Sequence, residues 1–161
     1  MSVEIADAPN VNEKLRVLGC HEPRGLAVLP VNLDAAPSRE ELLLGGEAET
    51  IEQLLRAADL TPEDVFAGQR PPSRLRKHLD WDGGMLFVGT LANIATIVSA
   101  FEAIMAHLRK QFPRGGRSPN VRLDVRIETT PTGSSKNIRF EGPAEKLSEL
   151  PCIIRKIRDV L

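Results

Sequence analysis

Residues 85–112 read MLFVGTLANIATIVSAFEAIMAHLRKQF, and this stretch decides the expected fold. Large apolar side chains recur along it every three or four residues, the spacing of one face of an α-helix. They are Phe87, Leu91, Ile94, Val98, Phe101, Met105, Leu108 and Phe112. Small residues recur on a second face, namely Gly89, Ala92, Thr96, Ser99, Ala103 and Ala106. The pattern predicts one long helix, with its bulky face on a sheet and its small-residue face forming an interface.

A membrane-inserting helix is the alternative for the same stretch. The 17 residues of 85–101 carry no charge, a length close to the minimum for crossing a bilayer. Small residues four apart are typical of helix pairs in lipid. Asn93 near the middle and Glu102 within the apolar face favour instead a buried helix of a globular protein. Insertion of residues 85–108 into a bilayer is therefore our second hypothesis.

The last third of the chain predicts a β-hairpin followed by a helix. Apolar residues alternate with charged ones over 121–128 and again over 137–141, with the turn-forming sequence TTPTGSSK between them. Residues 143–161 then carry an apolar stripe at helical spacing, and Pro151 should kink or split that helix. The glycine- and proline-containing break at 113–120 is a possible sub-boundary.

The first half of the chain is less regular. Residues 1–12 are polar and without periodicity, which predicts a flexible leader. Two strands are expected over 14–20 and 25–33, the second at a sheet edge because Pro30 lacks a backbone donor. A helix is expected over 49–60.

Together these elements predict an α+β fold. A small sheet would consist of the N-terminal strand pair and the C-terminal hairpin, covered by the long central helix and the C-terminal helix. Residues 13–161 would form a single domain, because a chain of 161 residues is long enough to bury one substantial core.

Charge and cysteine content set the expected surroundings. The net charge of −1 conceals an acidic first half and a basic second half: residues 1–84 hold 15 acids and 9 bases, and residues 85–161 hold 7 acids and 12 bases. The two cysteines, Cys20 and Cys152, are far apart, and the N-terminus has no apolar signal segment. We expect a cytoplasmic protein with two buried, free thiols.

One short segment holds residues suited to metal or acid–base chemistry. In an extended conformation His78, Asp80 and Asp82 would share one side of the chain, which makes a small metal-dependent hydrolase or nuclease our third hypothesis. No further residue nearby completes a coordination shell. Residues 20–22 hold a thiol, an imidazole and a carboxylate at the end of an expected strand. Adjacent side chains on a strand point to opposite faces, so Cys20 and His21 cannot pair directly.

Basic residues in the last third form a weak candidate for anion binding. Arginines flank a glycine pair in the break after the long helix, and others alternate along the hairpin. The set is Arg114, Gly115, Gly116, Arg117, Arg122, Arg126 and Arg139. Acidic residues are interleaved with the hairpin arginines, which favours a solvated, salt-bridged face over a nucleic-acid surface.

The second half of the chain contains, in order, the segment FVGTLANIATIVSAFEAIMAHLRKQF, the basic break, and the hairpin VRLDVRIETT with KNIRFEGPAEKLSEL. This succession resembles the small accessory modules that are encoded with effectors in bacterial defence systems. The resemblance covers about residues 86–161 and is one of pattern, and the first 85 residues have no counterpart in such modules. It implies a non-catalytic piece that couples an effector to a sensor or that self-associates.

The leading functional hypothesis is therefore a non-enzymatic adaptor without cofactor or metal. Abundant packing surface and the lack of an assembled catalytic motif both favour it. Its partner would be another protein or a second copy, held through the small-residue face of 85–112.

Overall fold

The computed structural model describes residues 2–75, 80–112, 119–128 and 134–159, and shows an α+β fold built on one five-stranded mixed sheet. The strands are β1 (Ser2–Ala8), β2 (Leu26–Leu29), β3 (Trp81–Val88), β4 (Asn120–Glu128) and β5 (Ser135–Pro143), in the spatial order β1-β5-β4-β3-β2. β3 and β4 are parallel, and every other neighbouring pair is antiparallel. The predicted fold class is confirmed.

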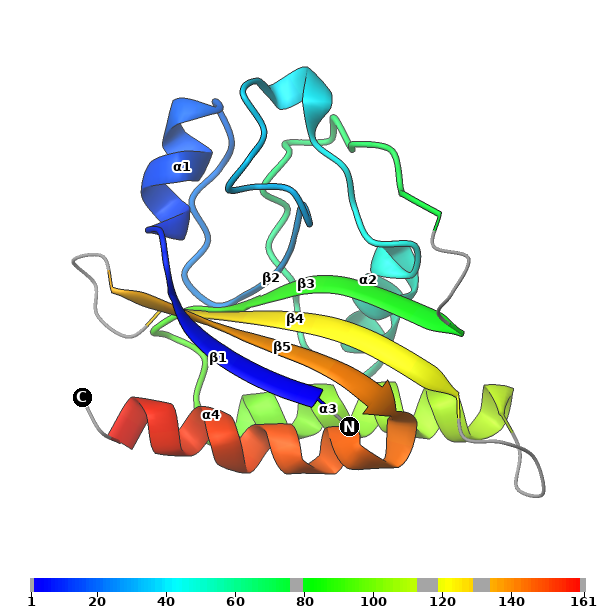
Figure 1. Ribbon diagram of the computed structural model, residues 1–161. Helices are drawn as coiled ribbons and strands as arrows, with labels where there is room; N and C mark the ends of the chain where they lie inside the picture. The colour runs from blue at the N-terminus through cyan, green and yellow to red at the C-terminus, as the bar shows by residue number, and fades with distance from the viewer. Residues whose placement is uncertain (1, 76–79, 113–118, 129–133, 160–161) are drawn as a thin grey trace.

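One face of the sheet is covered by helices (Figure 1). The central helix α3 (Ile94–Gln111) connects β3 to β4 and lies beside α4 (Leu150–Asp159) under the sheet, while α2 (Ala48–Ala57) contacts both α3 and β3. α3 buries Ile97, Ala100, Phe101, Ile104 and Leu108. The closing helical segment is divided into a 3-10 helix η2 (Ala144–Glu149) and α4, as the proline predicted.

The opposite face is covered by α1 (Val11–Val17) and by irregular segments that include the 3-10 helix η1 (Arg39–Glu41) (Figure 1). On β4 this face carries Asp124, Arg126 and Glu128, all of which are buried. The expected solvated face of the hairpin is therefore wrong for β4. The N-terminal half of the chain lies over these charges and provides partners for Arg126 and Glu128, which no local pattern in β4 reveals.

The N-terminal predictions need correction. Residues 2–8 of the expected flexible leader form β1, which pairs with β5 more than 100 residues away. The expected strand 14–20 lies mostly in α1, where Val11 and Leu15 are one helical turn apart and both buried. The side chain of Asn10 caps this helix by accepting a hydrogen bond from the backbone of Glu13 at 3.1 Å.

The long helix predicted over 85–112 begins at Ile94 instead. Its first four residues belong to β3, a strand that is buried at every position and paired on both sides. A short apolar run fits a buried strand as well as a helix, so periodicity alone does not separate the two. Asn93 marks the true start of α3, because its side chain accepts a hydrogen bond from the backbone of Thr96 at 2.8 Å. Leu91, expected on the buried face, lies in the connecting loop with 71% of its surface exposed.

The possible sub-boundary at 113–120 lies mostly outside the described residues, since the structure describes only 119 and 120 of that stretch. Within the described part of the chain, the strands and helices share one hydrophobic core.

Gly89 has a role that the helical pattern concealed. It follows β3, and its backbone N–H donates to the carbonyl of Gly25 at 2.8 Å. A Cβ atom at this position would lie 2.1 Å from the carbonyl oxygen of Arg24. The small residue is needed here because two backbone segments approach each other closely, not because two helices meet.

We expect Gly89→Ala to lower the free energy of unfolding by about 2–3 kcal/mol, because the added methyl forces the two backbones apart. Gly25→Ala is the matched control, since a Cβ atom there would meet Glu63 Oε2 at 3.5 Å, an ordinary contact. Urea denaturation of both variants measures the difference. An equal effect of the two substitutions would contradict this explanation.

Candidate functional site

The outer edge of β1 is the candidate interaction site. The sheet has two edges, and the edge at β2 is covered: all four residues of β2 are buried, and the backbone of Glu63 donates to the carbonyl of Leu26 at 2.9 Å. β1 is paired on one side only, with β5. In Figure 1 it forms the outer boundary of the sheet. Of the strands that the structure describes, β1 alone offers a long, uncovered edge.

β1 follows β5 in continuous register from Ser2 opposite Glu141 to Ala8 opposite Ser135. Val3 and Ile5 are in register with the buried Phe140 and Ile138, so both belong to the side of the sheet that the helices cover. This alternation explains why the segment forms a strand. Nevertheless 51% of the Ile5 surface is exposed.

The predicted small-residue interface is only partly assembled. Thr96, Ser99, Ala103 and Ala106 lie on α3, where Ser99 and Ala106 are exposed and the other two are half-buried. Gly89 and Ala92 belong to the loop before α3, and both of their carbonyls accept hydrogen bonds from the guanidinium of Arg158. Contact of another chain with the α3 residues stays a prediction.

A polar cavity of about 790 Å³ lies where β3 and β4 end. Residues that line it include Asn12, Arg16, His21, Arg24, Thr90 and Glu128. Glu128 is buried, and its Oε2 accepts a hydrogen bond from Asn12 Nδ2 at 2.8 Å. Burial raises the pKa of Glu128, and hydrogen bonds from Thr90 offset this only in part. The carboxylate of Glu128 is held by Asn12 and Thr90.

The hairpin arginines of the predicted anion site are committed to acids. Arg126, with 2% of its surface exposed, is held by Asp34 through two hydrogen bonds of 2.7 and 3.2 Å. Arg139 donates to Asp124 at 3.2 Å, and Arg122 lies 3.9 Å from the same carboxylate. These residues line a cavity of about 210 Å³. The interleaved acids balance much of the arginine charge, which leaves little net attraction for an anion.

The glycine-flanking part of the predicted anion site lies outside the described residues, and it consists of Arg114, Gly115, Gly116 and Arg117.

The proposed metal or acid–base set is not brought together in the described structure. His78 lies outside the described residues. Asp80 accepts a hydrogen bond from the backbone of Asn120 at 2.8 Å, and Asp82 accepts one from Arg74 Nε at 2.9 Å. Across the described residues, no three histidine, cysteine or acidic side chains are placed to hold a metal ion.

Asp82 is a structural carboxylate. Burial alone would raise its pKa, but hydrogen bonds from Arg74 and from the backbone of Gly46 and Gly84 outweigh burial, so that the pKa of Asp82 is lowered. Its oxygens thereby join three segments: the loop before α2, the segment around Arg74, and the start of β3.

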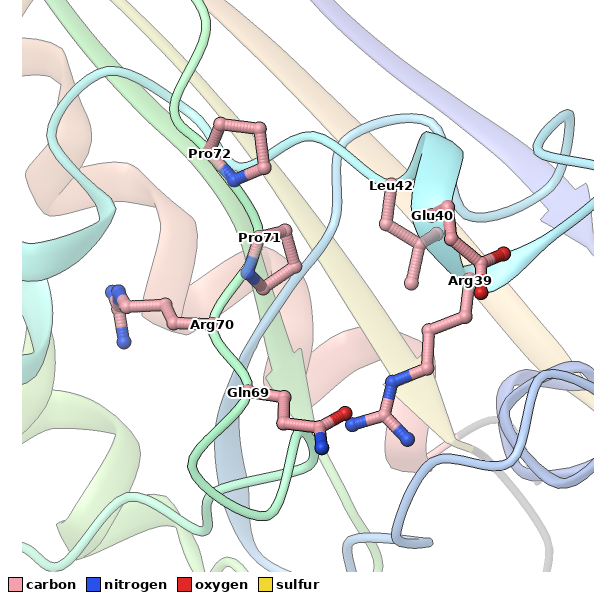
Figure 2. A pocket seen from close by; sticks show the side chains of 7 residues that line it. All are labelled: Arg39, Glu40, Leu42, Gln69, Arg70, Pro71 and Pro72. Atoms are coloured by element: carbon pink, nitrogen blue, oxygen red, sulfur yellow. The ribbon is translucent and has the colours of Figure 1, made fainter.

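A third hollow of about 390 Å³ lies between η1 and residues 69–72. Figure 2 shows the guanidinium of Arg39 directed toward Gln69, whereas Arg70 points away from it. Arg39 donates to the carbonyls of Gly19 and Phe66, and Arg70 donates to Glu52 at 2.8 Å. Arg39 thus ties η1 to two loops, and Arg70 ties residues 69–72 to α2.

The two cysteines differ from expectation in one respect. Cys20 is buried, and this burial raises the pKa of its thiol. Cys152 is exposed on α4, so the prediction that both thiols are buried is wrong for this residue. Neither cysteine forms a disulfide.

Three comparisons with known proteins add no functional assignment: no family model, no curated protein and no solved structure matches this chain. Sequence reasoning missed β1 as a site. The available signal was the alternation of Val3 and Ile5 with Glu4 and Ala6, a weak pattern in a segment that we interpreted as a leader.

We expect Glu128→Gln to stabilise the protein at pH 7, because the buried carboxylate of the native residue is unfavourable when ionised. When the pKa of a carboxyl group is higher in the folded state than in the unfolded state, the free energy of unfolding falls as the pH rises above the unfolded pKa of about 4.3. The difference in melting temperature should therefore be absent near pH 4 and grow toward neutral pH. Thermal unfolding of both proteins from pH 4 to 8 measures this difference in melting temperature. A difference that is largest in acid would contradict the raised pKa of Glu128.

Asp82→Asn should lower the free energy of unfolding by about 3 kcal/mol at pH 7, because it leaves Arg74 without its charged partner. The pKa of Asp82 is lower in the folded state than in the unfolded state. Asp82 therefore contributes fully to the free energy of unfolding above its unfolded pKa of about 3.9, and this contribution is lost as the pH falls through its folded pKa. The deficit of the variant, measured by urea denaturation, should shrink in acid. Adding magnesium should leave the free energy of unfolding of the wild type unchanged. If magnesium stabilises the wild type but not Asp82→Asn, that result would instead support a metal site.

Proposed function

We propose that this chain is a non-enzymatic interaction protein, an adaptor that binds its partner by accepting an extended strand along β1. The observation that carries the proposal is the uncovered edge of a seven-residue strand. Along such an edge, backbone N–H and C=O groups are free to pair with a strand of another chain. Backbone hydrogen bonds would supply affinity, and the alternating side chains would supply specificity.

β1 lacks several of the features that protect an edge. Its sequence, SVEIADA, contains no proline and no lysine, and its pairing with β5 shows no bulge. Its acidic residues, Glu4 and Asp7, disfavour a partner strand with acids at the opposing positions. Asp7 forms an ion pair with Lys136, which reduces its charge toward an incoming strand.

The setting that we propose comes from the resemblance of residues 86–161 to accessory modules of bacterial defence systems. Such a role needs a protein that couples an effector to a sensor without chemistry of its own. An edge that accepts a strand is suited to this task, because it can engage different chains through the same backbone geometry.

The two other hypotheses have less support. No helix within the described residues is long and apolar enough to cross a membrane. For the hydrolase, Asp82 is bound to Arg74 and to two backbone N–H groups, so it is not poised to hold a metal or act as a base.

A test of the proposal is selection from a random library of displayed heptapeptides on immobilised protein. We expect wild-type protein to enrich extended peptides, and we expect amide hydrogen exchange to slow within β1 when a selected peptide binds. Ile5→Lys should weaken this binding at least tenfold, since it places a charge on the apolar side of the edge.

The matched controls place a charge on other exposed apolar positions. Val17→Lys on α1 should leave peptide binding unchanged. Ala106→Arg on the small-residue flank of α3 should also leave it unchanged. Two results would refute β1 as the binding site. One is that the selected peptides bind Ile5→Lys and wild type with equal affinity, and the other is that they no longer bind Ala106→Arg.

A further inference from the structure

We propose that the strand accepted by β1 is β1 of a second copy, antiparallel to the first and related to it by a two-fold axis beside Ile5. This inference rests on the proposed function and names its partner. Joining two open edges in this way would make one continuous ten-stranded sheet. A two-fold interface of this kind is closed, because each copy uses the one edge that its described strands leave open, so that none of them offers an edge to a third copy.

Symmetry restricts the possible registers. The axis stands perpendicular to the sheet, so Val3 and Ile5 of both copies stay on the helix side, and opposing residues must both be odd or both be even in number. The pairing is therefore centred on one residue of β1. Each choice of that residue brings a different set of side chains face to face.

Charge and the number of paired residues select among these registers. A centre at Glu4 or at Asp7 would place two identical carboxylates directly opposite each other, which is destabilising. A centre at Ala6 would leave Ser2 and Val3 without partners, because the positions opposite them lie beyond the end of β1. A centre at Val3 would leave most of the strand unpaired.

A centre at Ile5 avoids these conflicts. Ile5 then lies opposite Ile5 of the second copy, Glu4 lies opposite Ala6, Val3 lies opposite Asp7, and Ser2 lies opposite Ala8. All seven residues are paired, and no like charges face each other directly. The two isoleucines cover each other at the position where the edge now exposes an apolar surface.

Two charges require separate treatment in this arrangement. Asp7, which would face Val3, is already paired with Lys136 of its own chain. Glu4 of one copy would lie diagonal to Glu4 of the other, about 7–8 Å away. Added salt screens this weak repulsion, so the dimer should become somewhat tighter as the ionic strength rises.

Cysteine cross-linking tests the register. In a Cys152→Ser background, which removes the exposed thiol, Ile5→Cys is compared with Val3→Cys on the same side of the strand. Opposing residues have Cβ atoms about 4.5–5.5 Å apart, close enough for a disulfide after a small adjustment. The two copies of residue 3 would be separated by about 13 Å along the strand.

We expect oxidised Ile5→Cys to form covalent dimer at least tenfold faster than Val3→Cys on non-reducing gels. A mixture of Val3→Cys and Asp7→Cys should cross-link, since these positions oppose each other in the proposed register. Light scattering should give a dimer mass for the reduced wild type and a monomer mass for Ile5→Lys, with circular dichroism confirming that the variant is folded.

The other outcomes separate this inference from the proposed function. A wild type that stays monomeric at millimolar concentration yet still selects peptides along β1 would overturn the second copy as partner and keep the strand-accepting edge. If Ile5→Lys leaves the dimer intact and Ala106→Arg dissociates it, the inference is overturned, and the small-residue face of α3 is the interface instead. Equal cross-linking of Ile5→Cys and Val3→Cys would overturn the register.

Discussion

The fold depends on covering the charged side of β4. Asp124, Arg126 and Glu128 stand in the middle of the sheet, and all are buried. Charges in such a position are tolerated only when each has a partner, because removing an unpaired charge from water costs several kcal/mol. Asp34 and Asn12, both from the first quarter of the chain, supply two of these partners. The N-terminal half must therefore close over the sheet for the C-terminal half to be stable.

The acidic and basic halves of the chain meet in two ion pairs. These pairs join Asp34 with Arg126 and Asp7 with Lys136. Charge complementarity between distant segments helps to specify which surfaces meet, although each exposed pair adds little stability. The opposite charges of the two halves are, at least in these pairs, satisfied within one molecule.

The elements that could be predicted from sequence are those whose local pattern matches their surroundings. α2 has one buried stripe, and β5 alternates between buried and more exposed residues, so periodicity locates both. β3 is covered on both faces and paired on both sides, and its eight residues carry no alternation. The apolar spacing of β3 and that of α3 happen to run in phase, which merged two elements into one expected helix.

The candidate site was harder to predict, because its defining property is the absence of a neighbour. Whether β1 is a strand depends on β5, and whether its edge is open depends on what the rest of the chain leaves uncovered; neither is a local property of SVEIADA. Gly89 is a second example. The sequence shows that a small residue stands at this position, but the reason it must be small is the carbonyl of Arg24, which lies in another segment.

The pairing of β1 with β5 has a consequence for biosynthesis. Ser2 lies opposite Glu141, so β1 acquires its partner only after every element between β1 and β5 has been synthesised. Contacts so distant in sequence form late and slowly. During that interval both sides of the N-terminal segment are unsatisfied, and nascent chains on one messenger are close neighbours. Assembly during translation would then compete with completion of the sheet, and the arrival of β5 would decide which pairing persists.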